Sequence, residues 1–88
     1  MYIGKVVGHL WSTKKEDSLT GMKLMIIEPM DPLNNCKERL PLVAVDSVGA
    51  GIGEIVIYTT GSSARKAVMN QEVPIDAAVL GIVDNVEI

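Results

Sequence analysis

The sequence predicts an all-β domain, a small five-stranded Greek-key barrel with one short helix. Three observations support this fold class. Five short apolar runs rich in β-branched residues are separated by glycine, proline and polar residues, and only one stretch carries a helix start signal. The length of 88 residues, 48% of them hydrophobic, suits one small core. We therefore expect a single domain over residues 1–88, without internal repeats or linkers.

The first predicted strand runs from Ile3 to Thr13 and contains two glycines, Gly4 and Gly8, where we expect bends. Side chains of a strand alternate between its two faces. This alternation puts Val6 and Leu10 on one face and Val7, His9 and Trp11 on the other.

Three further strands follow. The second is predicted from Met22 to Glu28, and Pro29 should end it because proline has no backbone N–H to donate. Residues 30–40 have the composition of a loop. Two more strands, over residues 41–48 and 54–60, are joined by a glycine-rich connection.

Ser62 or Ser63 can serve as the N-cap of a short helix of about two turns that ends near Asn70. After it, residues 77–86 form an apolar run interrupted by Gly81, which predicts a fifth strand kinked in its middle. Five strands with one helix before the last strand indicate a barrel of the OB type.

The charge pattern excludes several classes of partner. The net charge is −3, with acidic and basic residues spread along the chain, so no cationic surface is expected for nucleic acid. No apolar run approaches the roughly 20 residues that span a bilayer, and the N-terminus lacks a signal-peptide pattern. We expect a cytoplasmic protein that binds neither nucleic acid nor membranes. Cys36 is the only cysteine, so neither an internal disulfide nor a cysteine zinc cluster can form.

The glycine-rich stretch from Gly49 to Glu54 does not fit a dinucleotide-binding loop. That fingerprint requires a third glycine where Glu54 stands, and a helix after it, whereas a strand-like run follows here. A carboxylate at this position would also repel a pyrophosphate. A tight connection whose glycines permit positive φ or close backbone approach explains the stretch better.

No catalytic or metal constellation stands out. The stretch from Gly61 to Arg65 begins like a nucleophile elbow, but Arg65 replaces the closing glycine. His9, the only histidine, has no recognisable orienting carboxylate, and a Cys36–His9 pair would place the nucleophile in a loop. The carboxylates show no metal-ligand spacing. We therefore expect no catalytic residue, no cofactor and no metal.

The apolar composition favours assembly. A chain this small has difficulty hiding so much aliphatic surface, so part of it should face a partner subunit, although a well-packed aliphatic monomer explains the composition nearly as well. Two other functions stay open: an OB-type binding module for a metabolite or nucleic acid, and a minor enzyme that uses His9.

Two motifs at a characteristic separation resemble the bacterial microcompartment vertex family, the pentameric shell proteins of ethanolamine-utilization and carboxysome type (EutN/CcmL). They are Asp46-Ser47-Val48-Gly49-Ala50-Gly51-Ile52-Gly53-Glu54 and Gly61-Ser62-Ser63-Ala64-Arg65. The resemblance extends over residues 4–8, 13–15, 19–24 and 74–84, which is nearly the whole chain.

This resemblance implies an OB-like barrel that forms a cyclic homopentamer and caps the vertices of a microcompartment shell made of hexameric shell proteins. It also implies candidate residues at the subunit interface or axial pore. Glycines and alanine would allow backbones to approach closely, Glu54 and Arg65 would form a polar contact that fixes register, and two serines would cap the helix and line the ring near its axis. The candidates are Gly49, Ala50, Gly51, Gly53, Glu54, Ser62, Ser63 and Arg65.

Overall fold

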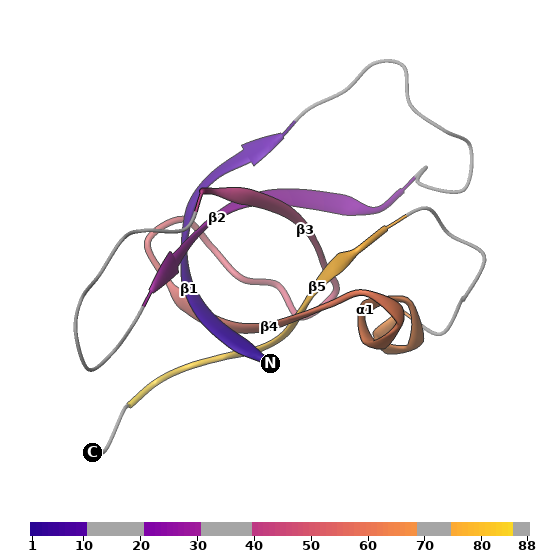
Figure 1. The fold of residues 1–88 in the computed structure, drawn as a ribbon. Coiled ribbons are helices and arrows are strands. Elements are labelled where there is room, and N and C mark those ends of the chain that lie inside the picture. The colour runs from indigo at the N-terminus through magenta and orange to yellow at the C-terminus, as the bar shows by residue number, and fades with distance from the viewer. Residues whose placement is uncertain (11–20, 31–39, 69–74, 86–88) are drawn as a thin grey trace.

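Five strands close into a barrel in the computed structural model, which describes residues 1–10, 21–30, 40–68 and 75–85. The elements are β1 (Tyr2–Leu10), β2 (Lys23–Met30), β3 (Leu42–Asp46), β4 (Ile55–Thr60), α1 (Ser62–Ala67) and β5 (Ala77–Ile82). Around the barrel the strands follow the order β1-β2-β3-β5-β4 (Figure 1). The prediction of an all-β, five-stranded barrel with one short helix is confirmed.

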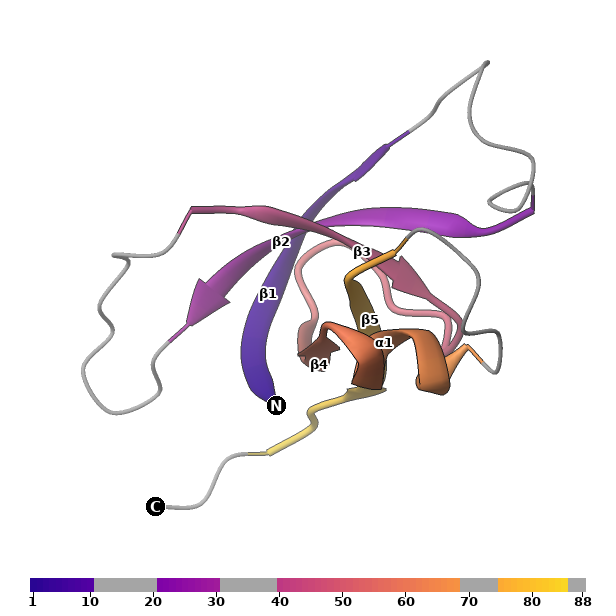
Figure 2. The same ribbon diagram turned by 45° about the vertical axis from the view of Figure 1, so that its right-hand side comes forward.

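All neighbouring strands are antiparallel except β3 and β5, which form a short parallel pair. A parallel pair needs a long connection, and here β4 and α1 lie within it. The helix lies outside the ring of strands, beside β4 and β5 (Figures 1 and 2).

The barrel interior is filled by small and aliphatic side chains with one tyrosine. Tyr58 is 1% exposed, and its ring stacks on that of Tyr2 with 5.5 Å between the ring centroids. The other buried members of this core are Val6, Met25, Ile27, Ala44, Ala50, Val56, Ala77 and Val79.

A bulge in β1 changes the faces on which its last residues lie. Val6 and Gly8 pair with consecutive residues of β2, so Val7 is an extra residue in the ladder. Because side chains alternate with a period of two, one extra residue moves every later side chain to the opposite face. The predicted grouping of Val6 with Leu10 is therefore wrong. Val6 is fully buried and Leu10 is exposed, so they lie on different faces. His9 is paired with Met25, a fully buried residue of β2.

The prediction that Pro29 ends the second strand is also wrong, because β2 continues to Met30 with Pro29 opposite Gly4. β3 pairs with β2 only from Lys23 to Ile27, so the last part of β2 has one open edge. Proline is tolerated there, since its missing N–H leaves no neighbouring strand without a donor.

The fifth strand is shorter than predicted and ends at Ile82, although the Val83 N–H still donates to the Ile55 carbonyl at 2.8 Å. The expected kink corresponds to a register shift beside Gly81, where Leu80 is the extra residue in the pairing with β4. The predictions for residues 11–13, 31–39, 70 and 86, Trp11 and Cys36 among them, lie outside the described residues.

Candidate functional site

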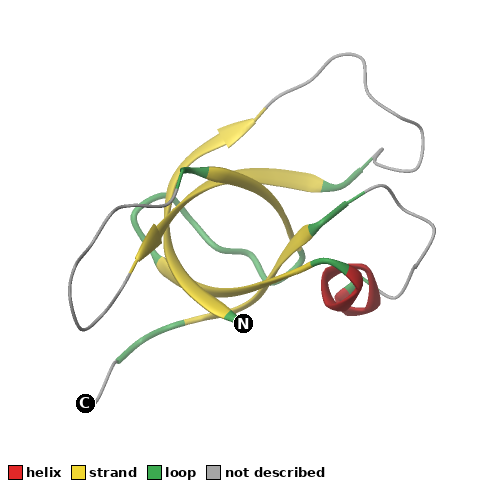
Figure 3. Ribbon diagram, in the orientation of Figure 1, coloured by secondary structure: helices red, strands yellow, loops and turns green. Residues whose placement is uncertain are grey.

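Five of the eight candidate residues lie in the connection between β3 and β4, residues 47–54, here called the glycine connection. It crosses the opening of the barrel in the view along the barrel axis (Figure 3). Ala50, in its middle, is fully buried and belongs to the core, so the glycine connection closes one end of the barrel. Gly49, Gly53 and Glu54 are exposed, and Gly51 is half-buried.

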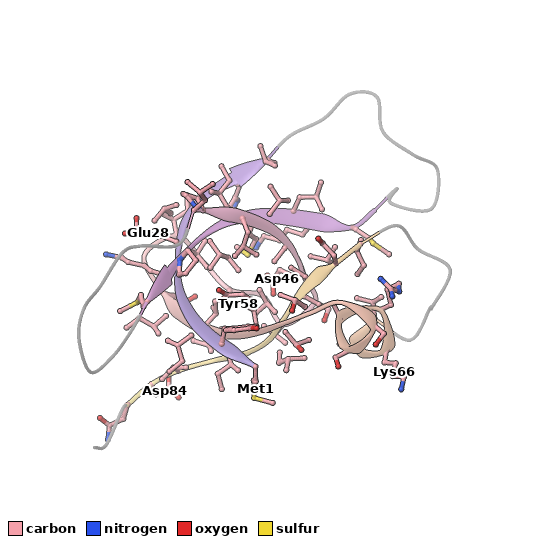
Figure 4. All side chains as sticks on the ribbon, in the orientation of Figure 1. Met1, Glu28, Asp46, Tyr58, Lys66 and Asp84 are labelled. Atoms are coloured by element: carbon pink, nitrogen blue, oxygen red, sulfur yellow. The ribbon has the colours of Figure 1, made fainter. Side chains whose placement is uncertain are left out.

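Asp46, the last residue of β3, anchors the first half of the glycine connection. Its Oδ1 accepts a hydrogen bond from the Val48 N–H at 2.9 Å, and its Oδ2 accepts one from the Ala50 N–H at 2.8 Å. The Asp46 side chain is 0% exposed, and Figure 4 shows it within the outline of the barrel. Buried carboxylates of this kind need such charge-assisted bonds to offset the loss of hydration.

Lys23 completes this anchor from the neighbouring strand. It is paired with Asp46 in the β2–β3 register, and its Nζ lies 3.7 Å from Asp46 Oδ2. The same ammonium group donates to the Ala50 carbonyl at 3.0 Å. The N–H and the carbonyl of Ala50 are thus both bound by side chains of the Asp46–Lys23 pair.

The second half of the glycine connection is bound to itself and to β1. The Glu54 Oε1 accepts a bond from the Gly51 N–H at 2.6 Å, and the Glu54 N–H donates to the Gly51 carbonyl at 3.2 Å. The Gly53 N–H donates to the Val6 carbonyl at 2.8 Å, and the Val6 N–H donates to the Glu54 carbonyl at 2.9 Å. Both halves of the glycine connection are therefore fixed within the subunit.

The three glycines of the connection serve different purposes. Gly49 and Gly53 have φ values of 88° and 92°, in the region that side chains with a Cβ rarely adopt. Gly51 has no positive φ, and a Cβ placed on it would meet only the Glu54 carboxylate, at 3.2 Å. The backbone conformation of the single subunit therefore requires glycine at Gly49 and Gly53 but not at Gly51.

The other three candidates lie on α1, and the predicted helix cap is wrong. The N-cap is Gly61, with φ 66° and ψ −144°, and neither Ser62 nor Ser63 makes a side-chain capping bond. The Gly61 N–H instead donates to the Asp76 carbonyl at 2.8 Å, which ties the helix start to the segment before β5. Both serines are exposed.

Arg65 also binds the segment before β5, since its Nη1 donates to the Ile75 carbonyl at 3.1 Å. Within the subunit Glu54 and Arg65 thus bind different partners, Gly51 and Ile75. A contact between Glu54 of one subunit and Arg65 of another stays a prediction.

Large apolar side chains are exposed on and around the glycine connection. Val48 is 42% exposed and Ile52 is 65% exposed. Others lie at the N-terminus, on the strands and beside β3: Met1, Tyr2, Val7, Leu10, Leu40, Val43 and Leu80.

The described residues offer little for catalysis. The Nε2 of His9 is buried and has no hydrogen-bond partner among them, so none of them orients it as a base. In the same part of the chain no group of three or more His, Cys, Asp or Glu side chains is placed to hold a metal ion. A recess of about 460 Å³ between β2, β3 and the end of α1 contains Lys23 and Asp46, but these two groups bind each other. None of the helices in the described ranges is both long and apolar enough to cross a membrane.

Sequence reasoning missed Asp46 and Lys23 as organisers of the site. An aspartate at the start of a turn, two residues before the N–H that it binds, is a known local pattern in which the carboxylate binds backbone N–H groups further along the chain. That pattern identifies Asp46 in retrospect. The role of Lys23 depends on the β2–β3 register, which cannot be inferred from a local sequence pattern.

Comparison with known proteins agrees with this architecture. The family model described as ethanolamine utilisation protein EutN/carboxysome matches residues 1–84. The chain belongs to this family. Among its relatives, the bacterial microcompartment shell vertex protein GrpN of Rhodospirillum rubrum is 48% identical over 91 residues, covering 99% of this chain and 97% of GrpN. The carboxysome shell vertex protein CcmL of a Nostoc species is 40% identical over 88 residues, covering 100% of this chain and 87% of CcmL.

Solved structures of family members share the fold. The pentameric microcompartment shell protein GrpN from Rhodospirillum rubrum matches with a TM-score of 0.86 and 48% identity, over 100% of this chain and 99% of that chain. CcmL from Gloeobacter violaceus matches with a TM-score of 0.90 and 38% identity, over 100% of this chain and 90% of that chain. The EutN/carboxysome family thus supplies both the sequence relatives and the fold.

Proposed function

We propose that this chain is a non-catalytic structural subunit, a single domain over residues 1–88. It would form a homopentameric ring at the vertices of a bacterial microcompartment shell in the cytoplasm. The observation that carries the proposal is the full-length similarity to GrpN, a shell vertex protein with a pentameric structure, at 48% identity. Hexameric shell proteins would be the neighbours of the ring.

The surface of the subunit supports assembly. Exposed Val48 and Ile52 flank glycines on a connection whose Ala50 backbone groups are already bound inside the subunit. Such a surface offers apolar contacts to a second copy with little loss of backbone freedom. In a cyclic ring each subunit uses two different patches, so scattered exposed apolar groups can be covered on two sides.

The candidate contact residues fit this proposal as follows. Gly49, Gly51 and Gly53 would allow a neighbouring backbone close to the glycine connection or line the axial opening, while Ala50, which is fully buried in the core, would support the connection from inside. Exposed Ser62 and Ser63 would face the neighbour or the axis, and Glu54 would meet Arg65 of the adjacent subunit.

Native mass spectrometry of the purified protein at several concentrations tests the proposal. We expect a stable five-subunit species. A monomer at every concentration would contradict the proposal and reopen the function of a small binding module.

Gly51→Val provides a sharper test of the contact site. Because Gly51 has no positive φ, the folded subunit can accept a side chain there if the Glu54 carboxylate moves, so circular dichroism should show an intact barrel. We expect the pentamer to be lost, since the added side chain would occupy space that the neighbour needs. A variant that still migrates as an intact ring would exclude Gly51 from the interface.

A further inference from the structure

We infer that Asp46 and Lys23 are positioning residues for ring assembly, which hold the glycine connection in the conformation that meets the neighbouring subunit. The inference rests on the proposed function. Two side chains outside the contact surface would determine the backbone conformation of that surface. The pair is called the Asp46–Lys23 anchor below.

The anchor is built into the sheet. Asp46 is paired with Lys23 on β2 and with Val79 on β5, so its backbone is fixed from both sides. Its carboxylate is fully buried and binds two N–H groups of the glycine connection, while the lysine binds a carbonyl of the same segment. The backbone positions of Asp46 and Lys23 are thus both determined by strand pairing.

The glycine connection needs such an anchor. Three of its eight residues are glycines, which lose more conformational freedom on folding than other residues. A loose connection would have to be ordered when subunits associate, and this cost would lower the apparent affinity at every contact of the ring. The anchor orders the segment before association.

The anchor also determines what the neighbour encounters. The N–H groups of Val48 and Ala50 and the carbonyl of Ala50 are bound within the subunit. The Val48 and Ile52 side chains meanwhile stay 42% and 65% exposed. The segment therefore presents apolar side chains on a fixed backbone.

Asp46→Asn tests the inference with almost no change in side-chain size. The amide keeps one acceptor oxygen but loses the charge and the second acceptor, so one of the two N–H groups loses its bond. We expect the N–H that loses its bond, that of Val48 or that of Ala50, to exchange with solvent at least about tenfold faster, a loss typical of one charge-assisted hydrogen bond. We also expect the ring to dissociate at a subunit concentration at least about tenfold higher than for the wild type.

Lys23→Met is the second variant, because it removes the cation while Asp46 keeps both N–H partners. It should weaken the ring in the same direction by a smaller factor, and it decides the matter if Asp46→Asn does not fold. Ile27→Val is the control, since it shortens a fully buried core side chain in β2 that makes no hydrogen bond to the glycine connection. It should lower the unfolding midpoint while leaving the exchange of the Val48 and Ala50 N–H groups and the ring dissociation concentration unchanged.

The outcomes separate this inference from the proposed function. A pentameric wild type whose rings dissociate at the same concentration after Asp46→Asn and Lys23→Met would overturn the anchor's role and leave the proposed function intact. Equal weakening by Ile27→Val would overturn it too, because general stability would then explain the loss. A monomeric wild type would overturn the proposed function and this inference with it.

Discussion

At individual positions of this barrel, the thin aliphatic core leaves little room for additional side-chain atoms. Gly4 is buried where β1 passes β2 and β4. A Cβ placed there would collide with the Ile27 side chain and would lie 3.0 Å from a ring carbon of Tyr58. The glycine lets the largest core side chain pack directly against the strand backbone.

Gly4→Ala should therefore destabilise the fold. Overpacking of a core typically costs about 1–3 kcal/mol, and each kcal/mol shifts the thermal midpoint of a domain this small by about 4–8 °C. Thermal unfolding followed by circular dichroism at fixed subunit concentration measures the change. Gly81→Ala is the matched control, because a Cβ there meets no atom within 4 Å and the backbone needs no positive φ. Equal midpoints for the two variants would show that the Gly4 contact relaxes at no cost.

At the residue scale, some features of the site can be inferred from the sequence and others cannot. Positive φ at Gly49 and Gly53 agrees with the glycine-rich pattern, since the need for such angles can be inferred from composition and turn chemistry. The bond between Lys23 and Ala50 joins residues 27 positions apart. Such a contact follows from strand register, which depends on the whole sheet.

At the scale of elements, the existence of each strand was predictable from apolar runs, while boundaries and faces were not. The β1 bulge at Val7 reversed the predicted faces because a single extra residue changes the alternation. β2 continues through Pro29 because its edge is open there, a property of the neighbouring strand. In both cases the deciding factor is a pairing partner that the local sequence does not contain.

The start of α1 gives a prediction at this scale. Gly61 has φ 66° and ψ −144°, a conformation that is strained for any residue with a Cβ. Gly61→Ala should therefore lower the free energy of unfolding by about 1–3 kcal/mol. Guanidinium chloride unfolding at fixed subunit concentration measures this loss.

Ser62→Ala and Ser63→Ala are the controls for the helix start. Neither serine caps the helix, so both variants should unfold within about 0.5 kcal/mol of the wild type. If Ser62→Ala destabilised as much as Gly61→Ala, a serine cap would operate in solution and the glycine N-cap assignment would be wrong.

At the scale of the whole molecule, different groups of residues hold the strands together and fix the backbone at the margins of the barrel. Core side chains and the Tyr2–Tyr58 stack hold the strands together, while the glycine connection and α1 lie at the margins, where polar groups fix backbone positions. Lys66 projects from α1 away from the barrel (Figure 4). This division suits the structural subunit proposed above, whose contact surface must be accurate in shape.

The proposed vertex role leads to a prediction about shell closure. A sheet tiled only by six-fold units is flat, and a five-fold unit removes one angular sector and forces curvature. Co-expression of this chain with a hexameric microcompartment shell protein should therefore give closed polyhedral shells in electron micrographs. Omitting the chain, or replacing it with the ring-deficient Gly51→Val variant, should give open sheets or tubes. Closed shells with identical vertices in the absence of the chain would mean that it does not cap them, because the hexameric protein would then close without any five-fold unit.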